Sequence, residues 1–326
     1  MTGEPGAGER TWWPQDLRWG CVLVAGFMAA MALLGVWMAV EAGRSGDLAV
    51  YAVSLAMVVL SGGCAATYVR VAGLRYLRLS SRITPRRDES RGPGLEIPTS
   101  RYRWPIVVFF GAVAVLGLVL CAAAFARRGT SPDPLVPDNG FDALWLGAAG
   151  AMGLLVALAV VGFGDETVLT VHRGGVRRRT RVRKLFWGRT VDAFVPWEEI
   201  VEFVPDELVV GSTLEVRNPV IRIRTRTPRP LSERLPYDSD DETTVMAYFL
   251  VTEPNALMDL LRTLRDNPER RELLDSPQVC ELLRPPPLGE RFRVARRMRR
   301  GAKAARRNAP IRRDVVAPAR RTDSHS

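Results

Sequence analysis

Four long apolar stretches dominate the first half of the chain. They run over about 19–40, 48–69, 104–125 and 141–163, and their only ionisable residue of the Asp, Glu, Lys or Arg type is Asp142, at an end. A bilayer core about 30 Å thick is crossed by about 20 helical residues at 1.5 Å each. The pattern therefore predicts four membrane-spanning helices within a transmembrane domain over 19–163.

The segment ahead of the first span does not have the pattern of a signal peptide. It carries Glu4, Glu9 and Asp16 in place of a clean basic region, and the apolar stretch that follows is longer than a signal core. We therefore expect the first span to remain as an anchor.

Arginine is distributed unevenly between the connections of the four spans. The connection 70–103 holds about nine arginines, whereas Arg44 follows the first span and Arg127 and Arg128 follow the third. Positively charged loops stay in the cytoplasm. The sequence therefore predicts a multi-pass protein of the cell membrane with a basic cytoplasmic loop at 70–103 and both termini, including segment 1–18, in the cytoplasm.

Small residues recur along the spans and allow helices to approach one another closely. They are Gly20, Ala25, Gly26, Ala29 and Ala30 in the first span and Gly147, Gly150 and Gly153 in the fourth. Packing into a four-helix bundle is one interpretation, and the general abundance of Gly and Ala in such helices is the other. The most polar interior groups, Ser54, Ser61 and Thr67, can bond to their own helix backbone, so the sequence does not favour an ion pathway.

Short alternating runs replace the long apolar ones after residue 164. Residues 168–171 precede a Gly174-Gly175 turn signal, and further short runs cover 191–195, 201–204 and 220–227. Short extended runs separated by turn residues predict a small antiparallel barrel or sandwich.

A helix is predicted to close this soluble half. Thr252 is a suitable N-cap, Pro254 suits the first turn, and Leu257, Leu260 and Leu264 recur at helical spacing. A second short helix is expected over about 268–274.

The order of these signals resembles the bacterial PH-like domains that are fused to membrane helices. The likeness lies in the hairpin 168–176, the Val-Pro-Trp-Glu-Glu-Ile step at 195–200 and the closing helix at 254–264, within a PH-like domain over 165–283. The resemblance implies a β-barrel of about seven strands plugged by a C-terminal helix. The expected fold is therefore an α+β membrane protein, with a four-helix transmembrane bundle followed by a PH-like small β-barrel with a C-terminal helix.

Basic residues gather on the first predicted hairpin, about ten residues after the fourth span. They are Arg173, Arg177, Arg178, Arg179, Arg181, Arg183 and Lys184. Contact with anionic lipid head groups is one interpretation, since each basic residue near such a surface contributes about 1 kcal/mol. A solvated strand face is the other. A second stripe, Arg222, Arg224 and Arg226, falls on one strand face, where the solvated interpretation is favoured.

The tail 284–326 carries about 14 Arg or Lys and about 3 Asp or Glu, and the whole chain has a formal net charge of +11. The surplus charge therefore lies in this tail, which we expect to be a basic disordered arm. A thin apolar stripe that includes Phe292 and Met298 allows a weak amphipathic helix on the inner leaflet as the alternative. Nucleic-acid binding is not favoured, because no defined binding module accompanies the arm.

Residues with catalytic or metal-binding chemistry are sparse. The four cysteines, Cys21, Cys64, Cys121 and Cys280, lack zinc or redox spacing. The paired acids lie in predicted turns, and His172 has no neighbouring nucleophile pattern. We expect a non-enzymatic protein without a cofactor.

These signals together predict a membrane-anchored scaffold. Its cytoplasmic PH-like module would act as an interaction surface at the inner leaflet, with the lipid bilayer, anionic head groups and an unidentified membrane or cytoplasmic protein as partners. A small-solute transporter component and an accessory subunit of a larger membrane complex are the alternatives.

Overall fold

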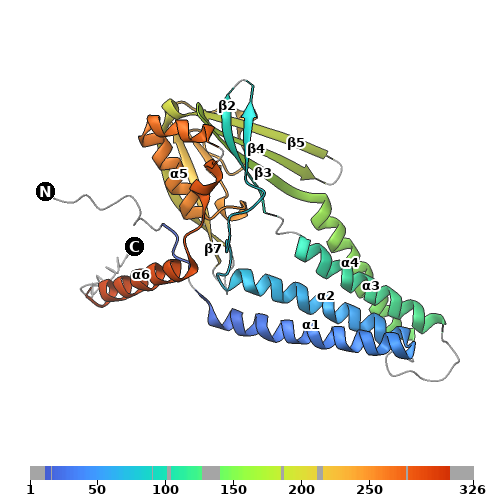
Figure 1. Ribbon diagram of the computed structural model, residues 1–326. Helices are drawn as coiled ribbons and strands as arrows, with labels where there is room; N and C mark the ends of the chain where they lie inside the picture. Colours follow the sequence, from blue (N-terminus) through green and yellow to red (C-terminus); the bar gives the residue numbers. More distant parts are fainter. Residues whose placement is uncertain are drawn as a thin grey trace, which may run out of the picture.

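Four long helices and a sheet-containing module make up the chain (Figure 1). The computed structural model describes residues 12–15, 17–89, 91–100, 104–126, 140–184, 187–210, 216–276 and 278–308. The helices are α1 (Trp19–Ser45), α2 (Leu48–Val71), α3 (Trp104–Ala126) and α4 (Gly140–Gly162). Each is long and apolar enough to cross a membrane, as predicted.

The four helices form two antiparallel hairpins that project from one side of the module (Figure 1). Helix α1 packs along α2, α3 packs along α4, and α2 contacts α3. The backbone N–H of Arg18 donates to the carbonyl of Ala72 at 3.1 Å, which ties the start of α1 to the end of α2. The described residues directly before α1, the end of α2 and the start of β3 after α4 lie at the same end of the helices (Figure 1).

Glycines set the contact between α3 and α4. A Cβ on Gly117 would lie 2.6 Å from the carbonyl oxygen of Leu146, and one on Gly150 would lie 2.8 Å from the backbone N of Leu118. Gly153 faces the backbone of α3 in the same way, whereas Gly20 of α1 meets open space. The glycines of the fourth span thus allow α3 and α4 to pack closely, whereas a Cβ on Gly20 in the first span would contact no other helix.

Polar side chains inside the spans bond to their own helix, as the sequence allowed. The hydroxyl of Ser54 donates to the carbonyl of Val50 at 2.7 Å, and that of Thr67 donates to the carbonyl of Gly63 at 2.9 Å. These bonds satisfy the hydroxyls without a second helix.

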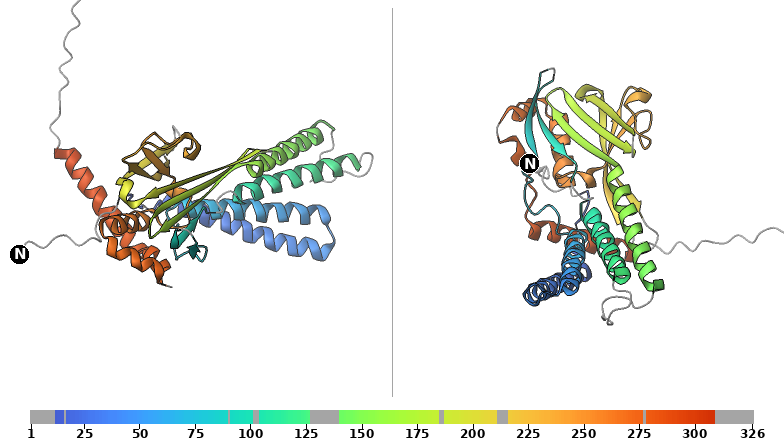
Figure 2. Two further views of the ribbon diagram at one scale, coloured as in Figure 1. Left: turned by 90° about the horizontal axis from the view of Figure 1, so that it is seen from above. Right: turned by 90° about the vertical axis from the view of Figure 1, so that its right-hand side faces the viewer.

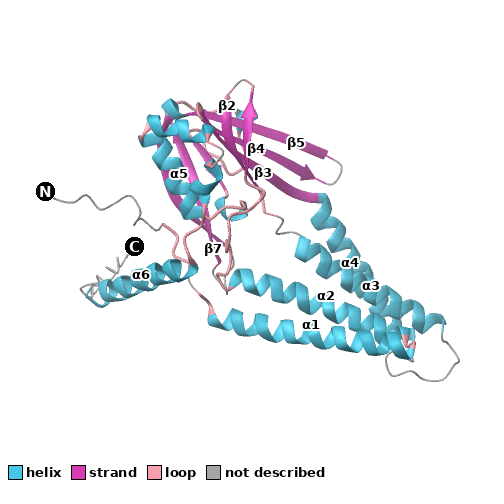
Figure 3. Ribbon diagram, viewed as in Figure 1, coloured by secondary structure: helices cyan, strands magenta, loops and turns pink. Residues whose placement is uncertain are grey.

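The module contains two antiparallel sheets, drawn in magenta in Figure 3. The five-stranded sheet has the order β1 (Thr84–Asp88), β2 (Gly92–Pro98), β3 (Phe163–His172), β4 (Gly175–Lys184) and β5 (Trp187–Pro196). The three-stranded sheet has the order β6 (Ile200–Val210), β7 (Val216–Thr225) and β8 (Glu242–Val245). Neither sheet closes on itself among the described strands, so the fold is α+β with antiparallel sheets and the predicted closed barrel is not confirmed.

The predicted cytoplasmic loop at 70–103 is more than a loop, which is a correction to the domain boundaries. It contains β1 and β2, and β2 pairs with β3, with Leu95 opposite Val171 and Ile97 opposite Leu169. The sheet module therefore begins before residue 165. The short hairpin is rich in Pro, Gly and Arg, so its period was too weak to predict strands.

One hydrophobic core joins both sheets to helix α5 (Pro254–Asp266). Ile97, Val195 and Ile223 are buried in it together with Leu257 and Leu261 of α5. The carboxylate of Glu253, not the expected Thr252, caps α5 by accepting from the backbone N–H of Ala256. The 3-10 segments η1 (Trp197–Glu199), η2 (Leu231–Glu233), η3 (Ala247–Phe249), η4 (Pro268–Asp275) and η5 (Val279–Leu283) complete the module.

The basic tail contains a helix, α6 (Leu288–Asn308), where the sequence predicted disorder. Arg291 fixes its first turn by donating to the carbonyls of Arg75 and Tyr76 at 3.1 and 2.9 Å. The buried Ala295 follows one turn later. Figures 1 and 2 show α6 leading away from the four helices rather than along their ends. The rest of the tail lies outside the described residues.

Candidate functional site

The seven basic residues predicted to contact lipid fall into two groups along the β3–β4 hairpin. Arg173, Arg177 and Arg178 lie toward the turn that joins β3 to β4, far from the helices. Arg179, Arg181, Arg183 and Lys184 lie toward the end of β4 that is nearest α4. We call the second group the helix-proximal cluster. The structure separates the two groups by their partners.

Arg173 and Arg177, the first two of the arginines near the turn, form ion pairs with carboxylates of the module. Arg173 lies 3.2 Å from Glu272 and 3.6 Å from Asp275 of η4. Arg177 bonds to Asp192 of β5 at 2.5 Å, and its other nitrogen lies 3.2 Å from Asp88 of β1. These arginines therefore tie the edges of the module together, which does not support their expected role as lipid contacts.

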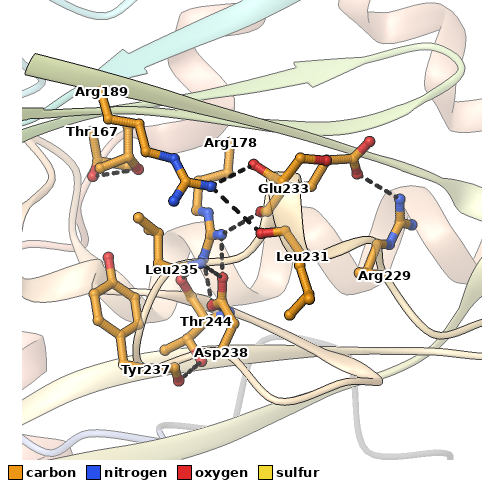
Figure 4. Close-up of polar contacts among 12 residues, drawn as sticks. Thr167, Arg178, Arg189, Arg229, Leu231, Glu233, Leu235, Tyr237, Asp238 and Thr244 are labelled. Carbon is orange, nitrogen blue, oxygen red and sulfur yellow. Dashed lines mark hydrogen bonds and ion pairs between the residues drawn. The ribbon is translucent and has the colours of Figure 1, made fainter.

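Arg178 lies inside the protein, which corrects its predicted place on a lipid-facing surface (Figure 4). Its side chain is 1% exposed and pairs with Asp238, which is 2% exposed, at 2.5 Å. The same guanidinium donates to the carbonyl of Thr244 at 2.6 Å. Asp238 also accepts from the backbone N–H groups of Leu235 and Thr244 at 2.7 and 2.8 Å. The pair joins β4 of one sheet to the residues before β8 of the other.

Two more arginines make contacts around η2: Arg189 reaches it from β5, and Arg229 lies just before it in the chain (Figure 4). Arg229 is nearly buried and lies 2.9 Å from Glu199 and 3.7 Å from Glu233. Arg189 of β5 donates to the carbonyl of Ser232 at 3.0 Å. Arginine side chains therefore bridge the two sheets at several points.

The helix-proximal cluster has the opposite character. Arg179, Arg181, Arg183 and Lys184 are exposed, and none forms an ion pair with another described residue. Arg179, Arg181 and Arg183 alternate along β4 and so share one face of the strand. Three like charges therefore lie side by side on this face, opposite to the face that carries Arg178, and Lys184 follows Arg183 at the end of the strand.

The pairing register brings this cluster to the end of α4. Strand β3 starts at Phe163, directly after α4 ends at Gly162, and Phe163 lies opposite Lys184. Lys184 in turn lies opposite Trp187 of β5. The side chain of Trp187 is 82% exposed and that of Phe163 is 52% exposed. Exposed aromatic and basic side chains therefore meet at the level where a spanning helix would leave the hydrocarbon.

Two residues of the second predicted stripe, Arg222 and Arg224, lie on β7 and form ion pairs, whereas Arg226 follows the end of the strand at Thr225. Ile221 and Ile223 are buried, while Arg222 and Arg224 lie on the other face. Arg222 bonds to Asp206 at 2.5 Å and both arginines bond to Glu242, at 3.2 and 2.7 Å. Hydrogen bonds from Arg224 and Arg222 lower the pKa of Glu242. The wet-face interpretation of this stripe agrees with these contacts.

The N-terminal segment docks on the module through contacts that the sequence did not indicate. The backbone N–H groups of Trp12 and Trp13 donate to the side-chain oxygen of Asn255 at 2.9 and 3.0 Å. The indole N–H of Trp13 donates to the carbonyl of Asp206 at 3.1 Å. Trp13 is a residue of the hydrophobic core of the module.

Two cavities adjoin this segment. One, of about 420 Å³, lies between α5 and α6 and includes Glu253, Asp259 and Arg291 in its lining. Burial and the neighbouring Glu253 raise the pKa of Asp259 to about 6. The other, of about 580 Å³, lies where α1 and α2 meet the module.

His172 is enclosed in the module. It is 1% exposed, and neither ring nitrogen has a hydrogen-bond partner among the described residues. Burial lowers the pKa of His172. Within the described ranges no three His, Cys, Asp or Glu side chains are grouped to hold a metal ion.

Comparison of the chain with protein-family models, curated proteins and solved structures found no match. The resemblance to PH-like domains therefore stays a prediction from the residue pattern.

Proposed function

We propose that the chain is an integral membrane protein that presents its two-sheet module to the cytoplasm as an interaction scaffold. Four helices of spanning length and apolarity support the anchor. The arginine-rich ends of the helices on the module side support the cytoplasmic orientation, since positive loops are retained there. Two antiparallel sheets around one core with a closing helix support a PH-like variant of the module.

The observation that carries this proposal is the location of the helix-proximal cluster. Arg179, Arg181, Arg183 and Lys184 are exposed at the end of β4 that adjoins the last turn of α4. In a spanning orientation of α4, this end of β4 lies at the head-group level of the inner leaflet. Attraction to anionic lipids is about 1 kcal/mol per basic residue near the surface. Trp187 and Phe163 supply the aromatic groups that prefer the same interface.

The consequence is a module held in a fixed pose at the membrane. The two hairpins of helices attach to it at α1, α2, α3 and α4, and the cluster adds a further contact beside α4. Faces of the module turned away from the four long helices, including the β3–β4 turn and η4, then remain accessible to cytoplasmic partners.

A fluorescent label at the tip of the β4–β5 hairpin tests the proposal. The full chain, with its four cysteines replaced by alanine and Trp187→Cys labelled with an environment-sensitive dye, is placed in nanodiscs of neutral or anionic phospholipid. We expect a blue-shifted emission that is quenched by nitroxide-bearing lipid, more strongly in anionic discs.

The matched control places the same dye at the opposite end of the hairpin, through Gly174→Cys, where a Cβ has space. That position is expected to show an aqueous spectrum and no quenching in either lipid. Equal quenching at both positions, or none at position 187, would contradict the proposed pose.

A further inference from the structure

The two sheets have four edge strands, β1, β5, β6 and β8, and the edge at β6 is closed by side chains. An edge strand carries a row of backbone N–H and C=O groups that proteins usually cover or block. The carbonyl of Phe203 on β6 accepts from Arg262 at 2.9 Å. The carbonyl of Asp206 accepts from the indole N–H of Trp13 at 3.1 Å. These contacts occupy the side of β6 that faces away from β7.

The edges at β8 and β1 are closed in other ways. The backbone N–H of Thr244 on β8 donates to Asp238 at 2.8 Å, and its carbonyl accepts from Arg178 at 2.6 Å. Strand β1 contains Pro85, which has no N–H group, followed by two arginines. Proline and charged side chains on an edge strand disfavour pairing with a further strand.

Strand β5 is the fourth edge, and part of it is open. A two-residue turn joins His172 of β3 to Gly175 of β4, so this flanking pair is hydrogen-bonded and fixes the alternation of bonds across the sheet. Counted from that pair through β4, the backbone N–H and C=O groups of Gly188, Thr190 and Asp192 point away from β4. Among the described residues, no group bonds to these outward backbone atoms.

The carbonyl of Phe194, two residues further along β5, agrees with this direction. It accepts from Arg229 at 2.5 Å, from outside the five-stranded sheet. Strand β5 is therefore closed around Phe194 and open over 188–192, in the half that lies nearer to α4. An open run of this kind is a template to which an extended segment can add as a further strand.

A hollow on one face of the sheet adjoins the open run. Its volume is about 390 Å³, and it is lined by Glu166, Val168, Arg179, Arg181, Gly188 and Thr190. Gly188 has no side chain and Thr190 has a small one, so the hollow extends to the edge of the sheet. Arg181 lies opposite Thr190 in the register. A long side chain on an added strand, placed beside Thr190, would therefore extend toward Arg181.

The hollow and the opposite face decide the chemistry of the added strand. Arg179 and Arg181 are exposed and form no ion pair with another described residue, and Glu166 is the one carboxylate in the lining. Carboxylates are the groups that guanidinium binds best through paired hydrogen bonds. On the opposite face of β5, the side chain of Trp187 is 82% exposed and offers an apolar contact.

We propose that the open run 188–192 of β5 binds an extended acidic segment of a partner protein as an added antiparallel strand. Alternate residues of the segment are acidic and enter the hollow, and the residues between them are apolar and lie on the side of Trp187. The inference rests on the proposed scaffold function and names where and how its partner binds. Arg183 and Lys184 do not line the hollow, so they remain for the lipid surface.

A second copy of the chain fits the open edge less well. Two β5 strands paired antiparallel would place Arg179 and Arg181 of both copies on the same face of the joined sheet. Like charges on one face of paired strands are destabilising, whereas an acidic segment supplies the opposite charge.

Fluorescence anisotropy tests the pairing, with the full chain in neutral detergent and a labelled peptide of alternating glutamate and valine. We expect saturable binding. In an antiparallel ladder the glutamates that face the hollow direct their N–H groups to β5, so methylation of the glutamate amides should weaken binding about tenfold. Methylation of the valine amides is the matched control and should leave binding nearly unchanged. A peptide with lysine in place of glutamate should bind about tenfold more weakly.

Variants of the chain locate the binding. Thr190→Pro removes an outward N–H, keeps the ladder to β4 and should weaken binding about tenfold. Arg179→Gln/Arg181→Gln should weaken binding of the glutamate peptide by a similar factor and remove its advantage over the lysine peptide. Arg86→Gln/Arg87→Gln makes the same change of charge at the opposite edge of the sheet and should bind as the unaltered chain does.

Several results would overturn the inference. They are no binding of the glutamate peptide, unchanged binding in either Thr190→Pro or Arg179→Gln/Arg181→Gln, and equal or reversed effects of the two methylation patterns. If Thr190→Pro unfolds, the arginine variant and the methylated peptides decide. Dimers of the unaltered chain that are lost in Thr190→Pro would assign the edge to a second copy and also overturn the acidic partner. The assay contains no lipid, so its failure leaves the dye experiment at position 187 intact, and the reverse also holds.

Discussion

Arg178 and Arg179 are adjacent in β4 and have opposite surroundings. Arg178 is buried and bonds to Asp238 and to the carbonyl of Thr244. Arg179 points to the other face of the strand and is exposed. In a chain this rich in arginine, the residue type does not define the role. The strand face on which an arginine lies decides whether it joins the two sheets or faces the outside.

The largest effect is expected from Arg178→Met, which removes the buried arginine of the two neighbours. Removing one member of a buried pair leaves Asp238 charged without its partner, at a cost of about 3–5 kcal/mol. We expect a large fall in the unfolding temperature of the full chain in detergent, followed by tryptophan fluorescence. Trp197 is buried in the core and reports on the module.

The double variant Arg178→Met/Asp238→Leu separates charge burial from packing. Replacing both members removes the unpaired buried charge, so we expect it to recover part of the lost stability. The backbone N–H groups of Leu235 and Thr244 lose Asp238 as their acceptor, which keeps the recovery incomplete. Arg179→Gln is the neighbouring control and should change the free energy of unfolding by less than about 0.5 kcal/mol. Equal losses in Arg178→Met and Arg179→Gln would mean that the buried pair does not join the sheets.

A smaller effect is expected at the half-exposed network on β7. Glu242→Gln removes the acceptor charge shared by Arg222 and Arg224, and we expect a loss of about 1 kcal/mol at pH 7. Because these arginines lower the pKa of Glu242, its contribution is present above the unfolded pKa of about 4.5 and is lost as pH falls through the folded value.

Unfolding at pH 7 and at pH 4 measures this contribution. The difference between the unaltered chain and Glu242→Gln should shrink as the pH is lowered. Glu198→Gln is the control, since this exposed carboxylate has a single contact with Arg271 at 3.4 Å. A pH-independent difference would indicate that packing, and not charge, accounts for the loss.

The sequence predicted the parts of the fold that have long or regular patterns. The four helices, the β3–β4 hairpin and the alternating strand with Ile221 and Ile223 inside are confirmed. The β1–β2 hairpin was missed because α3 and α4 lie between it and β3 in the sequence. No local alternation of apolar and polar residues reveals a contact between segments that far apart. Arg178 was misplaced for a related reason, since its partner Asp238 lies 60 residues later.

Contacts between residues far apart in the sequence limit the prediction of the site in the same way. A run of arginines marks the hairpin, but only the register shows that Lys184 returns to the level of Phe163 while Arg173 does not. The larger cavity includes Arg18, Arg70 and Arg75 in its lining, and their proximity depends on how two helices attach to a sheet module. Charge patterns along a chain cannot supply that geometry.

Asp259 is the opposite case to Glu242, because burial affects the pKa of its carboxyl group more strongly than the nearby cation does. Burial and Glu253 raise the pKa of Asp259 to about 6 despite Arg262. Stability from this group is fully present below its unfolded pKa of about 3.8 and is lost as pH rises through about 6. Asp259→Asn should therefore raise the unfolding temperature at pH 7 by about 1–3 °C, and little at pH 4, as measured by thermal unfolding. A destabilised variant at pH 7 would contradict this balance.

The smallest effect on stability, and the sharpest test of the comparison, is expected from the helix-proximal cluster. Replacing Arg179, Arg181, Arg183 and Lys184 together by glutamine removes no ion pair between described residues, so the unfolding temperature in neutral detergent should stay nearly constant. The hairpin dye at position 187 should nevertheless lose its response to anionic lipid. The unaltered cluster should lose the same response as salt is raised toward 1 M, where charges are screened beyond about 3 Å. If this variant were destabilised as strongly as Arg178→Met, the four residues would have a structural role like that of the buried arginine. A stable chain whose lipid response persists would show that these four charges are not needed for the contact.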